Sequence, residues 1–84
     1  MDFTRGRIVR SRAGRDKGLY LAVLADAGDR VLVANGRGRR VSAPKAKNPA
    51  HLAPTTVVLA EGELGSDKLL SAAIAAAFPA AQGI

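Results

Sequence analysis

The fold of this chain is limited most by a charged stretch between two hydrophobic runs, Arg12-Ala13-Gly14-Arg15-Asp16-Lys17-Gly18. The flanking runs, residues 6–11 and 19–24, are rich in aliphatic and β-branched residues, as is typical of β-strands. The stretch is therefore predicted to be a basic hairpin loop. Glycine permits a positive φ or a close backbone approach, so the loop amides could hold a phosphate while the loop's cations supply charge. The alternative is a solvated basic turn without a ligand.

Turn residues recur after this loop at the spacing expected for a small barrel. Asp26 to Asp29 ends the second run, residues 30–34 form a third, and Asn35-Gly36 is a strong two-residue hairpin signal. We therefore expect a fourth strand over residues 37–41. Apolar residues fall on both faces of these strands, which predicts a closed barrel that another segment covers in part.

The remainder of the chain is predicted to be extended at first and helical near its end. Residues 42–54 contain three prolines and should run extended, with Leu52 in a short edge strand. Residues 55–60 are a short β-branched run. Ser66 can then cap a helix over residues 67–78 that Pro79 ends.

The predicted helix carries one apolar stripe and is too short to be stable alone in water. The stripe is expected to pack on the protein's own sheet; a partner or a second copy is the alternative. Its members are Leu69, Leu70, Ala73, Ile74, Ala77 and Phe78.

Counted from Ile8, the alternating strand, the basic loop and Gly18 as the eleventh residue resemble the KOW motif of ribosomal proteins and transcription elongation factors. The segments Val41, Pro44-Lys45-Ala46-Lys47-Asn48 and His51-Leu52 are similar to the stretch after that motif in small bacterial KOW-domain proteins. Those proteins are related to a large-subunit ribosomal protein group of archaea and eukaryotes. The resemblance covers residues 3–54 and implies a small SH3-like (KOW) β-barrel. Together with the helix predicted from the residues after it, this gives a mostly β fold with a short C-terminal α-helix. Residues 1–54 are thus expected to form an RNA-binding barrel and residues 55–84 a C-terminal extension.

The charge of the chain is concentrated in its KOW-like part. Residues 1–54 hold twelve Lys and Arg against four Asp and Glu, or +8, and residues 55–84 hold one against three, or −2, which together give +6. A positive field attracts polyanions, and arginine, which supplies nine of the thirteen cations, pairs bidentately with phosphate. Nucleic acid is therefore favoured over a membrane, because no basic amphipathic helix accompanies the charge.

Neither catalysis nor a cofactor is expected. The chain has one histidine, no cysteine and no carboxylate pair at a catalytic spacing, and a metal site would lack ligands. The absence of cysteine suits a reducing cytosol. The first residues are too polar for a signal peptide and no apolar run reaches 18 residues, so a cytoplasmic location is expected.

The sequence thus predicts an RNA-binding protein, ribosomal or ribosome-associated, that contacts ribosomal RNA through basic loops, with ribosomal proteins as further partners and self-association through the helix as an open alternative. A protein-interaction module of the transcription or translation machinery and a non-specific binder of double-stranded DNA are the alternative functions. Gly14 and Gly18 are the expected structural glycines. Tyr20 is expected to pack in the core rather than stack on a base. The predicted RNA contacts are Arg12, Arg15, Lys17, Arg37, Arg39, Arg40, Lys45, Lys47 and His51.

Overall fold

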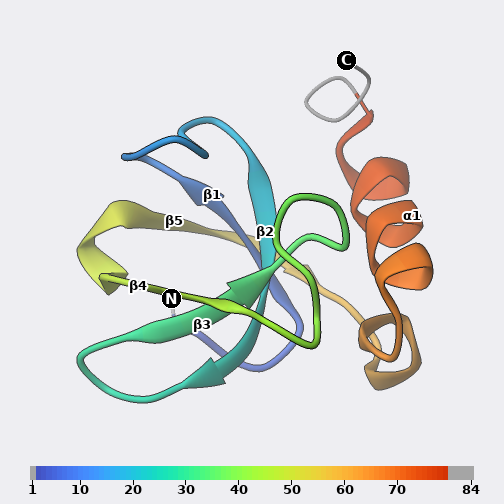
Figure 1. Ribbon diagram of the computed structural model, residues 1–84, viewed down its shortest axis with the longest axis horizontal. Helices are drawn as coiled ribbons and strands as arrows, with labels where there is room; N and C mark the ends of the chain where they lie inside the picture. Colours follow the sequence, from blue (N-terminus) through green and yellow to red (C-terminus); the bar gives the residue numbers. More distant parts are fainter. Residues whose placement is uncertain (1, 80–84) are drawn as a thin grey trace.

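A computed structural model describes residues 2–79, which form an antiparallel sheet of five strands followed by one α-helix (Figure 1). The predicted mostly β fold with a C-terminal helix is confirmed. The elements in chain order are β1 (Arg7–Ser11), β2 (Tyr20–Asp26), β3 (Val31–Ala34), β4 (Lys45–Lys47), the 3-10 helix η1 (Pro49–His51), β5 (Leu52–Val58), the 3-10 helix η2 (Glu61–Leu64) and α1 (Asp67–Ala77).

The sheet has the strand order β4-β3-β2-β1-β5. The first four strands pair with their neighbours along the chain, and β5 returns to the other side of β1. The short η1 turn joins β4 to β5, so the two edge strands are consecutive in the chain. The boundary expected between residues 54 and 55 falls inside β5, and the sheet therefore includes residues from both predicted units.

Apolar side chains are buried on both faces of the sheet, because successive side chains of a strand point to opposite faces. In β2, Ala22 and Leu24 face a cluster that includes Leu70 and Ile74 of α1. Leu21 and Val23 face a second cluster, which contains strand residues with Phe3 at its margin. The helix therefore covers one face of the sheet, and the other face is buried by the strands themselves. The core members of the second cluster are Val9, Leu21, Val23, Val31, Val33 and Leu52.

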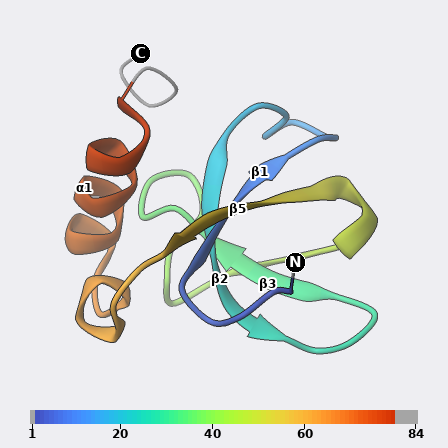
Figure 2. The same ribbon diagram turned by 180° about the vertical axis from the view of Figure 1, so that it is seen from behind.

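The C-terminal helix forms where the sequence predicts it and packs on the protein's own sheet (Figure 2). Ser66 is the N-cap, with its side chain accepting a hydrogen bond from the Leu69 amide at 3.1 Å. Leu70 and Ile74 are fully buried, and Phe78 stacks on Tyr20 with ring centroids 4.1 Å apart. Leu69, which the apolar spacing assigns to the buried stripe, is instead 54% exposed.

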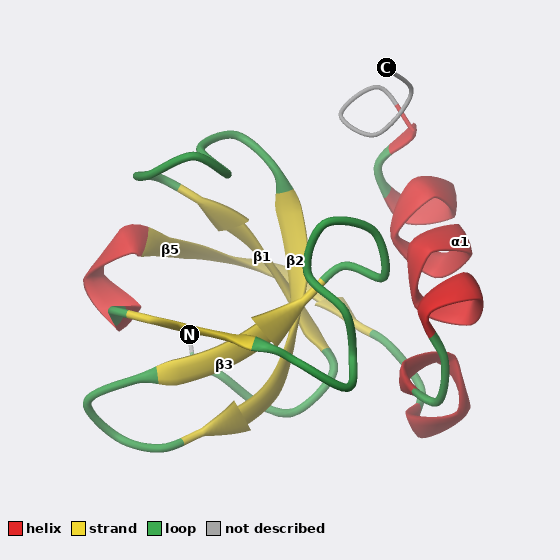
Figure 3. Cartoon of the chain, viewed as in Figure 1, coloured by secondary structure: helices red, strands yellow, loops and turns green. Residues whose placement is uncertain are grey.

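The prediction of a strand over residues 37–41 is wrong. The chain between β3 and β4 instead forms an irregular loop beside α1 (Figure 3). A tight type I′ hairpin needs a positive φ at both central residues, and here only Gly36 has one. The buried side chain of Asn35 instead accepts hydrogen bonds from the amides of Arg37 and Arg39 at 2.9 and 3.0 Å. The Val41 amide donates to Asp67 Oδ1 of α1 at 2.8 Å, which fixes the far side of the loop.

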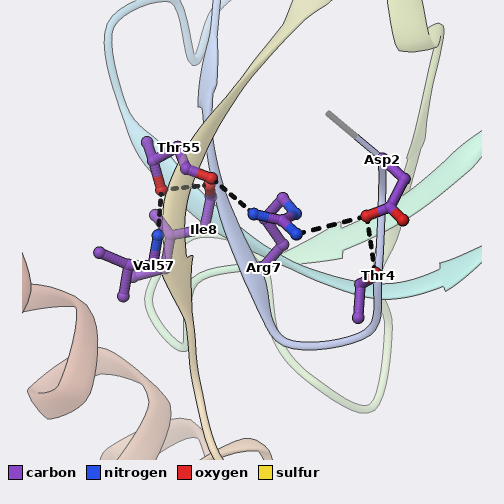
Figure 4. Close-up of polar contacts among 6 residues, drawn as sticks. All are labelled: Asp2, Thr4, Arg7, Ile8, Thr55 and Val57. Carbon is purple, nitrogen blue, oxygen red and sulfur yellow. Dashed lines mark hydrogen bonds and ion pairs between the residues drawn. The ribbon is translucent and has the colours of Figure 1, made fainter.

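The pairing of β1 with β5 changes register between Arg7 and Val9, and side chains satisfy the backbone there (Figure 4). The hydroxyl of Thr55 donates to the Ile8 carbonyl at 2.7 Å. The Arg7 guanidinium donates to the Thr55 carbonyl at 2.9 Å and to Asp2 Oδ1 at 3.3 Å. Arg7 therefore links the segment before β1 to the edge strand β5.

Candidate nucleic-acid interface

An open groove with a volume of about 390 Å³ lies at the end of the sheet opposite α1, where η1 is found in Figures 1 and 2. Four parts of the chain form it: the loop between β1 and β2, the residue before β3, strand β4, and η1 with its preceding residue. We call it the basic groove, and its lining residues are Ala13, Gly14, Arg30, Lys45, Ala46, Lys47, Asn48 and His51.

The loop at residues 12–18 has the glycine geometry that the sequence predicts. Gly14 and Gly18 have φ values of 86° and 89°, in the region that favours glycine. The amide of Gly18 donates to the Ser11 carbonyl at 2.8 Å, which closes the loop at its base. Arg12, Arg15 and Lys17 are exposed, and their side chains make no hydrogen bond or ion pair with any part of residues 2–79.

A buried polar cluster of Ser11, Asp16 and Lys47 holds this loop against β4. Lys47 Nζ donates to Asp16 Oδ1 at 2.8 Å, to the Ala13 carbonyl at 2.9 Å and to Ser11 Oγ at 3.0 Å. These bonds use all three donors of the ammonium group. Lys47 and Asp16 are only 6% and 4% exposed. Lys47, a predicted RNA contact, is therefore oriented into the protein and supports the loop from below.

The charge of Asp16 is stabilised inside this cluster. Burial alone would raise the pKa of the Asp16 carboxyl, because it disfavours the ionised form. The hydrogen bonds from Lys47 and Ser11, together with the charges of Lys47 and Lys45, outweigh burial and lower that pKa below its ordinary value. Asp16 Oδ2 is buried with no hydrogen-bond partner in the described part of the chain.

Another part of the groove is formed by η1 and by Arg30, the residue before β3. The Arg12 amide donates to the His51 carbonyl at 2.8 Å, which ties the loop to η1. Asn48 caps η1 by accepting a hydrogen bond from the Ala50 amide at 2.9 Å. Exposed His51 and half-buried Lys45 have side chains without a hydrogen-bond partner in residues 2–79.

Arg30 belongs to the groove, although the sequence pattern places it only in a strand. Val31 pairs with Lys47 in the β3–β4 ladder, so the residue before Val31 lies next to the residue after Lys47, which is Asn48. Arg30 is exposed and donates one hydrogen bond, to the Asp29 carbonyl at 2.8 Å. Its basic character is visible in the sequence, but its position depends on a strand pairing that the sequence pattern wrongly assigns to residues 37–41.

The predicted RNA contacts do not all gather at the groove. Lys45, Lys47 and His51 line it, although the Lys47 ammonium is bonded inside the protein, and the loop that carries Arg12, Arg15 and Lys17 forms its rim. The remaining three, Arg37, Arg39 and Arg40, lie on the loop beside α1 and do not line the groove. The nine residues therefore separate into a groove set, a helix-side set and the interior Lys47.

Arg5 also makes contacts within the folded protein. Its guanidinium lies 2.7 Å from Glu61 Oε1 and donates to the Leu24 carbonyl at 2.8 Å. The hydrogen bond from Arg5 lowers the pKa of Glu61. This contact joins the segment before β1 to η2.

Two further observations concern residues 2–79 alone. None of their helices is both long and apolar enough to cross a bilayer. Their His, Asp and Glu residues form no group of three or more that could hold a metal ion.

Comparison with models of known protein families gives no match, and comparison with curated proteins gives none either. The KOW resemblance therefore stays a prediction from the sequence at residues 8–18 and between residues 41 and 52.

Proposed function

We propose that the protein binds RNA through the basic groove and the loop at residues 12–18. The observation that carries this proposal is a groove lined by Arg30, Lys45 and His51, beside a loop with three further cations whose side chains have no partner in residues 2–79. Each phosphate that these cations neutralise releases counterions, which favours binding. No catalytic group is required for this activity.

We further propose that the sheet is an SH3-like barrel of the KOW type. The cluster of strand residues on the face away from α1 is at most 3% exposed, although none of the helices within residues 2–79 covers it. A sheet that curls around its own inner face explains this burial, and η1 joins the two edge strands. With the KOW-like motif, this favours ribosomal RNA as the ligand and a cytoplasmic, ribosome-associated protein.

The salt dependence of RNA binding tests the proposal. A variant with Arg12→Ala, Arg15→Ala and Lys17→Ala should bind structured RNA more weakly, and each phosphate contact that it removes should lower the slope of log K against log salt by roughly 0.7–0.9. Lys68→Ala is the control, because this exposed lysine lies on α1, away from the groove. An unchanged slope in the triple variant would contradict the assigned surface.

Competition between structured RNA and duplex DNA of equal length separates RNA binding from general phosphate binding, because phosphate contacts carry little base information. Preference for RNA supports the proposal, and equal competition points to a non-specific nucleic-acid binder. Co-sedimentation with ribosomal particles at graded salt, repeated after nuclease treatment, then distinguishes an RNA ligand from a protein ligand. A complex that survives both nuclease and high salt would favour the protein-interaction module instead.

A further inference from the structure

The size of the basic groove suits one nucleotide and not a duplex. Its volume of about 390 Å³ is near the lower end of the roughly 300–1,000 Å³ found for small-ligand pockets. Bases in an RNA helix are stacked and paired, whereas an unpaired nucleotide can be turned outward and bound on its face and edge. The groove therefore selects for a flexible part of an RNA.

The groove offers a different chemical group for each part of a nucleotide. Lys45 provides a compact charge for a phosphate, and the Arg30 guanidinium provides a planar fork. The imidazole of His51 is an exposed flat ring on which a base can stack. The side-chain carbonyl of Asn48 is occupied by the Ala50 amide, which leaves its amide group as a donor for the edge of a base.

The backbone that carries these groups is fixed by hydrogen bonds within residues 2–79. The loop wall is tied to η1 through Arg12 and His51, and the floor is held by the three hydrogen bonds of Lys47. Gly14 covers this floor, since a Cβ there would lie 3.7 Å from both Asp16 Oδ1 and Lys47 Nζ. A preformed pocket lowers the entropy cost of binding.

We infer that the basic groove binds a single unpaired RNA nucleotide, with its phosphate held by Lys45 and Arg30 and its base stacked on His51. The loop at residues 12–18 then holds the neighbouring backbone. This inference rests on the proposed RNA binding and adds a preference for bulged or looped RNA over a continuous duplex.

Two hairpin RNAs test the inference, one fully paired and one identical except for a single-nucleotide bulge that carries 2-aminopurine. The wild-type protein should bind the bulged RNA about 5- to 150-fold more tightly, the range expected for stacking of one base on an aromatic ring. The 2-aminopurine fluorescence should also change on binding. Equal affinity for the two hairpins overturns the inference and leaves RNA binding in place, whereas failure to bind either one at low salt overturns both proposals.

Two matched variants test whether the preference for the bulged hairpin arises from the groove. His51→Ala should lower the affinity for the bulged hairpin more than the affinity for the paired hairpin, and so remove the preference for the bulge, because the unpaired base stacks on this ring. Lys17→Ala, on the loop, should weaken both hairpins by the same factor. Preserved amide spectra of both variants establish that they fold. If His51→Ala keeps the preference, the nucleotide does not bind as inferred.

A titration with a mononucleotide gives a second measurement that does not depend on a variant. Uridine and adenosine monophosphate at millimolar concentration should shift the amide signals of Gly14, Lys45, Ala46, Asn48 and His51. Shifts confined to the helix-side loop at residues 36–41, or no shifts at all, would overturn the assignment of the groove.

Discussion

Lys47 Nζ lies 2.8 Å from Asp16 Oδ1, although the two residues are 31 positions apart in the chain. Both side chains are almost completely buried, and the contact joins the tip of the basic loop to edge strand β4. The one acidic residue in a loop of cations is thus a structural anchor. Asp16 thus fixes the position of the loop that carries the exposed cations.

Removal of the cation from this pair should destabilise the fold strongly. Lys47→Met leaves the buried Asp16 carboxylate unpaired, which costs about 3–5 kcal/mol and is a large share of the stability of a small domain. Urea unfolding measures this loss. Lys45→Met is the control, because Lys45 is only half-buried and its change should alter stability by no more than about 0.5 kcal/mol. Equal losses in both variants would contradict the structural role of Lys47.

The same pair predicts the response to acid. The pKa of Asp16 is lower in the folded protein than in the unfolded chain, where aspartate has a pKa of about 3.9. Its contribution is therefore fully present above about pH 4 and is lost as the pH falls through the folded pKa.

Asp16→Asn removes this titration. The difference in unfolding free energy between wild type and Asp16→Asn should be constant near neutral pH and should shrink as the pH falls below about 4. Asp2 and Glu61 also have lowered pKa values, but they are present in both proteins and cancel in the comparison. Parallel stability curves over the acid range would show that Asp16 does not titrate with the fold.

The sequence predicts correctly those features that local propensity and helix capping determine. Strands β1 and β2 follow from β-branched runs, the positive φ of Gly18 from a tight loop, and α1 from the Ser66 cap and the apolar spacing. Each depends on residues close together in the chain, where propensity and capping act directly.

The features that the sequence does not predict depend on tertiary contacts. Asn35-Gly36 is a hairpin signal by itself, but the Asn35 side chain and the docking of the loop on α1 favour a wider loop. That loop shifts the fourth strand to Lys45–Lys47, which buries Lys47 and brings Arg30 to the groove. An isolated lysine in a basic chain gives no sign of which partner it will find, so its role cannot be predicted from its neighbours in the sequence.

The close approach of Gly36 to α1 predicts a large cost for a small substitution. A Cβ at Gly36 would collide with the backbone of Asp67 and crowd that of Ser71, and its φ of 76° disfavours any side chain. Gly28 has a φ of 89° but faces open space. Gly28→Ala should therefore cost about 1 kcal/mol from backbone strain alone, and Gly36→Ala about 1–3 kcal/mol more. Equal melting temperatures for the two variants would mean that the loop does not pack on the helix as described.

The final prediction distinguishes a helix that completes the core from one that joins two molecules. Ile74 is 1% exposed and Leu69 is 54% exposed on the same helix. Ile74→Ala should cost about 2–5 kcal/mol because it leaves a cavity against the sheet, while Leu69→Ala should change stability by no more than about 0.5 kcal/mol.

Protein concentration provides the control for this pair. Packing within one chain makes the destabilisation of Ile74→Ala independent of concentration, and the wild-type melting temperature should not rise as the protein is concentrated. Self-association through the exposed side of α1 would give the opposite pattern. The wild-type melting temperature would then rise with concentration, and Leu69→Ala would abolish that rise by mass action. Sedimentation of wild type and Leu69→Ala over the same concentrations decides between these outcomes.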